Sequence, residues 1–279
     1  MTDPETKAAD GEGDKDAPKF AWRDLLLRVL ELPLAFLDAV GATVLLAVNV
    51  IVWAIRPPYR VRQLIASLDF VGVQSFFIVA LTGVFTGMVF ALQTVYGFRR
   101  FGAEGMVGGV VAISLTREIS PVFAGLMVTS RAGSAMAAEL GNMRVTEQID
   151  AIATMGVSPV QYLVVPRVIA AVVMLPCLCV LFTLVGMTGA YAVAVSLLNV
   201  DPGVFLERVR TLVEPRDVMM GLVKSGVNGF LIAVISCKQG FYASGGAKGV
   251  GLATTRAVVQ SAVAILIANY IITMWMTDV

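Results

Sequence analysis

Histidine is absent from this chain of 279 residues, and only 3 cysteines are present. Without histidine, the chain has no Ser-His or Cys-His catalytic pair and no histidine metal site. Cys177, Cys179 and Cys237 all lie in or beside apolar segments, which favours inert buried thiols over a disulfide. The net charge of +1 gives no basic excess of the kind found in nucleic-acid-binding proteins. We therefore expect no metal, no cofactor and no nucleic-acid partner.

Charge is also scarce, while apolar residues are abundant. Charged residues make up 15% of the chain, against about 25% in a typical soluble domain. Hydrophobic residues make up 57%, and the mean hydropathy is +0.82. Apolar segments that are long enough to span a bilayer cross it as helices, because every backbone polar group is then bonded internally. The composition predicts an all-α integral membrane protein.

The apolar pattern predicts five transmembrane helices. They are expected at about 73–95, 107–138, 160–198, 217–237 and 257–277. The first contains Gly83 and Gly87, a spacing that lets helices approach closely. We favour packing within one subunit over a dimer contact for this pair.

The N-terminal part of the chain differs from the rest. Residues 1–19 are polar and carry mixed charge, which predicts a disordered tail in the cytoplasm. Residues 20–72 are expected to form interfacial amphipathic helices, with 60–72 as a connector to the first span. The stretch 34–55 is long enough to span, so the residues alone leave both positions open. Lys and Arg concentrate in 1–72, which favours a cytoplasmic N-terminus.

A polar helix is expected at about 139–155, between the second and third spans. Five polar side chains gather there within about three helical turns: Glu139, Arg144, Glu147, Gln148 and Asp150. Charge is unfavourable inside a bilayer, so this helix should lie in water. Arg144 is spaced to contact Glu147 and Gln148 on a helix. One interpretation is a solvated loop helix; the favoured one is a coupling helix that docks onto a separate ATPase.

Charged residues also lie within the spans. Asp217, Lys224 and Asn228 share one face of the fourth span. Because Asp217 and Lys224 are about 10 Å apart along the axis, they cannot satisfy each other. Their expected partners are Arg117 and Glu118 on the second span. The group is either a structural ion-pair network or, as we favour, the polar wall of a cavity that meets a lipid headgroup.

No energy source is encoded in the chain. A phosphate-binding loop requires G-x-x-x-x-G-K-[ST]. The nearest segment, 240–249, has a displaced Lys248 and no Ser or Thr after it. The nucleophile elbow G-x-S-x-G is also absent. We therefore expect a non-catalytic protein that depends on a separate ATPase.

Several segments carry a resemblance to a known family. The run ELGNMRVTEQIDAIATMGVSPVQYLVVPR at 139–167 resembles the signature of the MlaE (YrbE) family, the permease subunits of Mce-type ABC transporters. TREISPVFAGLMVTSRAGSAMAAE at 116–139 is similar to the same family, as are VKSGVNGF at 223–230 and GLATTRAVV at 251–259. The likeness extends over about 64–277. Some relatives carry an acidic residue where this chain has Asn269, so a role for that position does not transfer.

This resemblance implies both an architecture and a function. It implies an in-plane interfacial helix at 34–55 and the coupling role of 139–155. It further implies a homodimer in the bacterial inner membrane, with two ATPase subunits and an Mce-type substrate-binding protein, moving phospholipid or a similar lipid. The rival interpretations are an ion-coupled secondary transporter and a lipid-modifying enzyme. The first would be expected to show an inverted repeat and the second a nucleophile–base pair, and we find neither in the sequence.

Overall fold

The computed structural model describes residues 41–57 and 60–277. The chain divides into two units, Met1–Val44 and Leu45–Val279, and the second holds the spans. The expected tail at 1–19 and the interfacial helices before residue 41 lie outside the described residues. Every regular element in the described part is helical, which confirms the all-α fold.

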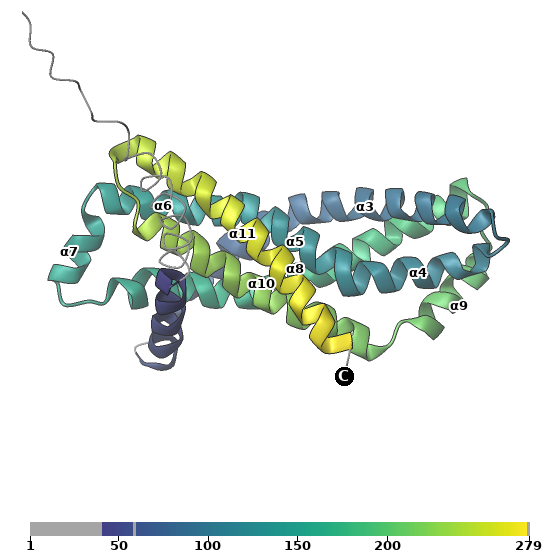
Figure 1. The fold of residues 1–279 in the computed structure, drawn as a ribbon, viewed down its shortest axis with the longest axis horizontal. Coiled ribbons are helices and arrows are strands. Elements are labelled where there is room, and N and C mark those ends of the chain that lie inside the picture. The colour runs from purple at the N-terminus through teal and green to yellow at the C-terminus, as the bar shows by residue number, and fades with distance from the viewer. Residues whose placement is uncertain (1–40, 58–59, 278–279) are drawn as a thin grey trace, which may run out of the picture. The chain divides into compact units, whose positions relative to one another are not determined.

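Five helices in the described part are long and apolar enough to cross a membrane (Figure 1). They are Val61–Arg99, Glu104–Val145, Val160–Leu197, Pro215–Phe241 and Gly246–Met276. The protein is therefore a multi-pass membrane protein, as expected. A further apolar helix, Gly41–Ile55, precedes them in the described residues. The interfacial position expected for 34–55 stays a prediction, because residues 34–40 lie outside the described part.

The first span begins earlier than the sequence indicated. α2 (Val61–Leu68) continues through a π-helical turn, Asp69–Val73, into α3 (Gln74–Arg99). The connector expected at 60–72 is therefore helical and continuous with the first span. No proline interrupts this stretch. The π turn changes the helix register without leaving backbone groups unpaired.

The second span extends past the expected membrane segment. It comprises α4 (Val107–Ser114), α5 (Ser120–Val128) and α6 (Ser134–Val145), joined by two π-helical turns. A separate helix, α7 (Gln148–Thr154), follows it. The single helix expected at 139–155 is therefore broken. Glu147 has a φ of 58° at the break, a left-handed conformation that a helix cannot contain.

The remaining spans are α8 (Val165–Tyr191), α10 (Pro215–Phe241) and α11 (Gly246–Thr277). Between α8 and α10 lies a short helix, α9 (Pro202–Leu212). It is capped by the Asp201 carboxylate, which accepts a hydrogen bond from the Val204 N–H at 2.9 Å. α10 and α11 are longer than predicted, so the glycine-rich stretch 238–256 is mostly helical. The turn itself needs only Gly245 and Gly246, both with positive φ.

α8 packs against both α3 and α10 through small residues. A Cβ added to Gly87 of α3 would lie 1.9 Å from the carbonyl oxygen of Gly186 on α8. A Cβ on Gly229 of α10 would lie 2.5 Å from the Ala171 carbonyl oxygen, also on α8. Such close backbone approach requires glycine. The Gly83 and Gly87 pair therefore serves packing within the subunit, as the sequence favoured.

Candidate functional site

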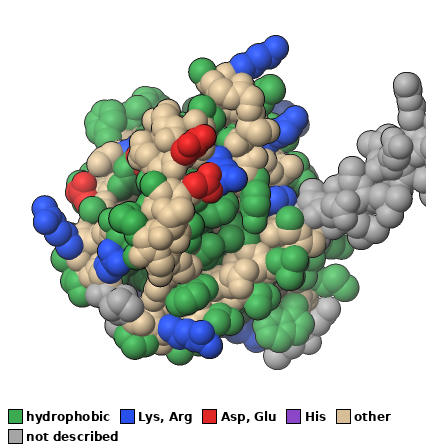
Figure 2. Space-filling view, turned by 90° about the vertical axis from the view of Figure 1, so that its left-hand side faces the viewer, with side chains coloured by type: hydrophobic (Ala, Val, Ile, Leu, Met, Phe, Trp, Pro, Cys, Tyr) green, Lys and Arg blue, Asp and Glu red, His purple; other side chains and the backbone are tan. Residues whose placement is uncertain are grey.

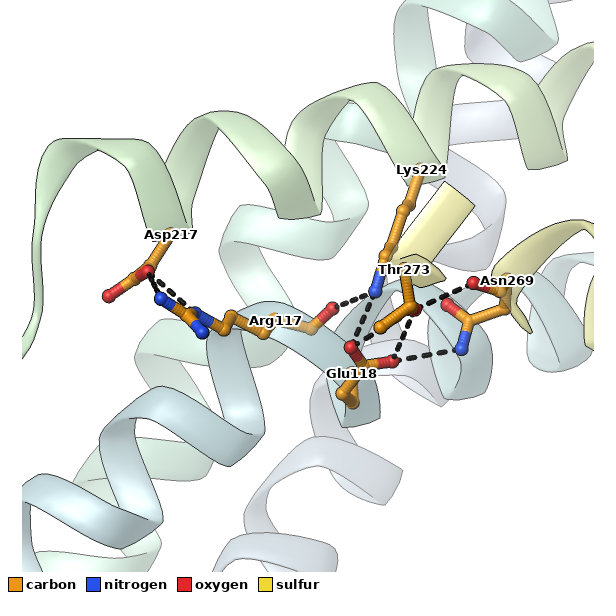
Figure 3. A network of polar contacts seen from close by, with 6 residues as sticks. All are labelled: Arg117, Glu118, Asp217, Lys224, Asn269 and Thr273. Carbon is orange, nitrogen blue, oxygen red and sulfur yellow. Dashed lines mark hydrogen bonds and ion pairs between the residues drawn. The ribbon is translucent and has the colours of Figure 1, made fainter. Parts of the chain in front are cut away.

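Six polar side chains from three spans form one cluster, which we call the polar cluster (Figure 3). Its members are Arg117, Glu118, Asp217, Lys224, Asn269 and Thr273. The Glu118 carboxylate lies at its centre and accepts hydrogen bonds from Lys224 Nζ at 2.6 Å and Asn269 Nδ2 at 2.9 Å. The Thr273 hydroxyl adds a third donor at 3.2 Å. One carboxylate thus joins the second, fourth and fifth spans.

Lys224 has a second acceptor, and a proline accounts for it. Its Nζ donates to the backbone carbonyl of Arg117 at 2.9 Å. Pro121 has no N–H, so that carbonyl lacks the usual partner four residues on. A π-helical turn, Leu115–Ile119, occupies the same place. The lysine side chain is 0% exposed, so both of its bonds form in the protein interior.

Asp217 connects the start of α10 to the second span. One carboxylate oxygen accepts from Arg117 Nε at 2.6 Å, within an ion pair. The other accepts from the Glu214 backbone N–H at 2.9 Å, as part of a capping box. The prediction that Asp217 and Lys224 find their partners at Arg117 and Glu118 is confirmed.

Asn228 lies outside the polar cluster. Its amide nitrogen donates to the Pro121 carbonyl at 3.2 Å, and the side chain is fully buried. It therefore stabilises the contact between α10 and α5. Of the five intramembrane residues singled out from the sequence, only Arg117 and Glu118 reach the surface, with side chains 38% and 39% exposed.

Two hollows are lined by residues of this part of the second span. Arg117 and Asp217 line a polar pocket of about 110 Å³ together with Glu214 and Arg216. An apolar hollow of about 400 Å³ is lined by Phe85, Val89, Phe90 and Phe123, along with Ile119, the residue after Glu118. A span that carries both a charged surface and an apolar one can accept a molecule that has an anionic head and hydrocarbon tails.

The segment after the second span has a different geometry from the one predicted. Arg144 does not pair with Glu147 or Gln148; its guanidinium bonds the Asp150 carboxylate at 2.6 Å. The helix break at Glu147 changes the direction of the chain between α6 and α7, so the helical spacing rule does not apply across it (Figure 1). Gln148 instead donates to the Thr146 hydroxyl at 3.0 Å.

The predicted coupling residues nevertheless gather at one end of the molecule, next to α7 (Figures 1 and 2). Glu139, Glu147, Gln148 and Asp150 are exposed, and Arg144 is half-buried. Glu139 also forms an ion pair with Arg167 at 2.8 Å, which ties α6 to the start of α8. Figure 2 looks onto this end and shows Lys and Arg side chains at several places around its edge.

Sequence reasoning missed three residues that hold the spans together. Asn269 and Thr273 both donate to Glu118 from α11. Arg131 on the second span donates to the Phe70 carbonyl at 2.5 Å and also bonds Gln74 on the first span. The one signal in the sequence is that these polar residues lie within apolar segments. Their partners could not be predicted, because they lie far away along the chain. The described residues contain no group of side chains that could hold a metal ion.

Comparison with known proteins is informative. The family model described as Permease MlaE matches residues 64–275. A probable ABC transporter permease protein of Rickettsia conorii is 48% identical over 85% of this chain and 92% of its own length. The chloroplastic protein TRIGALACTOSYLDIACYLGLYCEROL 1 of Arabidopsis thaliana is 37% identical over 82% of this chain and 65% of its own. The intermembrane phospholipid transport system permease protein MlaE of Haemophilus influenzae is 35% identical over 75% of this chain and 81% of its own. This chain therefore belongs to the MlaE family of ABC transporter permeases.

Proposed function

We propose that this permease moves a phospholipid, or a similar lipid, between the bacterial inner membrane and an Mce-type partner. It does so as a homodimer, with energy from two separate ATPase subunits. The observation that carries the lipid substrate is the partly exposed Arg117 of the polar cluster, on a span that also lines an apolar hollow. The printed name of the Haemophilus influenzae relative supports the same substrate class.

Within the polar cluster, we assign headgroup contact to Arg117. Its guanidinium is partly exposed and can form two parallel hydrogen bonds to a phosphate. Asp217 and Lys224 are positioning residues in the conformation described, because both side chains are fully buried and already bonded to the second span. The apolar hollow lined by Phe85 and Phe123 is the proposed path for the lipid tails.

We assign ATPase docking to the α6–α7 segment. Its exposed surface combines the acidic residues Glu147 and Asp150 with the exposed apolar side chains of Val145 and Met155. The ion pair between Arg144 and Asp150 closes the turn and gives α7 a fixed direction. In the proposed topology this end lies in the cytoplasm, where the positive-inside rule favours its basic edge.

The lipid assignment is tested with Arg117→Gln in the assembled transporter, reconstituted in vesicles. Lipid retained per folded complex and lipid transfer per folded complex should both fall severalfold, and the yield should fall as well because the buried Asp217 loses its ion-pair partner. Arg100→Gln, which removes an exposed charge from the loop after α3, is the matched control. Unchanged transfer with Arg117→Gln would reject the headgroup role.

The docking assignment is tested by charge reversal. Glu147→Lys should reduce recovery of the ATPase with the permease, because a like charge at a docked surface costs several kcal/mol. Glu207→Lys makes the same change on exposed α9 at the other end of the molecule and should leave recovery unchanged (Figure 1). Equal recovery with both variants would count against this docking surface.

A further inference from the structure

A cleft between the first and third spans has no part in the function described above. It lies beside the end of the helix Gly41–Ile55, and its volume is about 60 Å³. The basic and aromatic residues on its rim are Trp53, Arg56 and Arg60. Its floor is mainly apolar and includes Leu64, Val165 and Ile169. The polar cluster, in contrast, joins the second, fourth and fifth spans.

The two arginines are held at the rim by specific contacts. The Arg60 guanidinium lies 4.3 Å from the centroid of the Tyr162 ring, and that of Arg56 lies 5.7 Å from the Trp53 ring. Gln161 donates to the Arg56 backbone carbonyl at 3.1 Å, which ties this segment to the start of the third span. Cation–π contact of this kind orients an arginine without neutralising it.

The charge at this rim is uncompensated within the described part of the chain. Arg56 and Arg60 are both exposed, and no carboxylate of the described residues lies within ion-pair distance of either. Among the described residues, no acidic side chain lines the cleft. Arginines, a tryptophan and a tyrosine at the end of a span are typical of the membrane–water interface. Basic pockets between spans at that depth favour anionic lipid headgroups.

We propose that this cleft binds one anionic phospholipid, such as phosphatidylglycerol, as a lipid bound to the permease in addition to its transported substrate. Arg56 and Arg60 bond the phosphate, and an acyl chain starts along Leu64 and Ile169. The cleft is far smaller than the about 300–1,000 Å³ of pockets that enclose a ligand. The headgroup therefore lies over the rim, with only a chain segment inside.

Trp53 provides a reporter at the site. The chain has 3 tryptophans, so Trp22→Phe with Trp275→Phe leaves Trp53 as the only tryptophan, which is excited selectively at the red edge of its absorption. This parent is reconstituted in nanodiscs containing brominated-chain phosphatidylglycerol or brominated-chain phosphatidylcholine at equal mole fraction. We expect the anionic lipid to quench Trp53 with a relative binding constant at least about fivefold higher, the effect of roughly one basic residue at a membrane surface.

Three variants of this parent test whether the preference depends on the two arginines of the cleft. Arg56→Gln with Arg60→Gln should bring the ratio of the two binding constants close to one. Arg62→Gln removes a neighbouring exposed arginine that does not line the cleft, and should leave the preference intact. Arg56→Lys with Arg60→Lys keeps the charge and should retain most of the preference. Added inorganic phosphate should not change the quenching, because bromine on the acyl chain reports lipid alone.

Three results would overturn the proposal. The first is equal quenching of the parent by the two lipids. The second is an equal loss of preference in Arg62→Gln and in the double glutamine variant, which would indicate only a general attraction to the basic edge. The third is loss of the preference in the double lysine variant while its elution profile and helix content match the parent. The double lysine variant therefore still tests the proposal if the double glutamine variant fails to fold.

Discussion

Lys224→Met replaces the buried ammonium of the polar cluster with an apolar side chain of similar length. It removes two hydrogen bonds, one to Glu118 and one to the Arg117 carbonyl. The sequence alone favoured direct headgroup contact for this lysine. Its burial and its two protein acceptors now favour a positioning role, so we expect a loss of stability before any loss of lipid affinity.

The expected loss of stability depends on the charge of Glu118, which the substitution leaves without its cationic partner. Breaking a fully buried pair typically costs about 3–5 kcal/mol, because the remaining charge is stranded. Here Glu118 keeps its bonds to Asn269 and Thr273 and is 39% exposed, so water and two donors offset part of that penalty. We expect about 2–3 kcal/mol for Lys224→Met, a fall in the thermal midpoint of roughly 5–10 °C. Glu118→Leu should cost more, since it strands a lysine that is 0% exposed.

A double-mutant cycle in detergent measures the pair directly. Thermal midpoints are recorded for each single variant and for Glu118→Leu with Lys224→Met. The double variant should be more stable than the sum of the two losses indicates, because neither charge is then stranded. Arg100→Met serves as the control for removing an exposed cation and should change the midpoint by less than about 1 °C, in line with typical surface substitutions. Additive losses in the double variant would refute the pairing.

Three further substitutions test neighbouring contacts. Asn269→Leu removes an amide donor to Glu118 and should lower stability by about 1–2 kcal/mol, measured by the same thermal assay. Gly87→Ala places a Cβ against the α8 backbone and should abolish the yield of folded protein, whereas Gly97→Ala, which has open space around it, should express normally on size-exclusion chromatography. Arg144→Gln opens the exposed ion pair that closes the α6–α7 turn; it should change stability by less than about 1 kcal/mol but reduce lipid-dependent ATP hydrolysis by the complex.

Simple length and spacing arguments predicted much of the fold and part of the site. The five spans follow from apolar length alone, because a bilayer requires continuous helices. The partners of Lys224 and Asp217 were predicted to lie on another helix, since charges about 10 Å apart on one helix cannot satisfy each other. Arg117 and Glu118 of the second span were the expected candidates, and both proved to be the partners.

The errors occurred where glycine or backbone strain decided the structure. The glycine-rich stretch 238–256 was left outside the predicted fourth and fifth spans, 217–237 and 257–277. In a membrane protein glycine also permits helix contact: a Cβ on Gly240 would lie 2.6 Å from the Ala137 carbonyl oxygen on α6. The helix break at Glu147 was not predicted, because glutamate is not a residue type that favours a left-handed conformation. That one residue redirects α7 and gives Arg144 a different acidic partner.

Burial was the property least accessible from sequence, and it changes how the polar cluster can work. A helical wheel places Lys224 on a polar face but does not reveal that the side chain is fully covered. Any motion that separates the fourth span from the second must break both bonds of this lysine at once. The stranded charges would then need water or an anionic phosphate to replace Glu118. We therefore expect such a motion to occur more readily when a lipid headgroup is present, so that substrate and conformation are coupled through this ion pair.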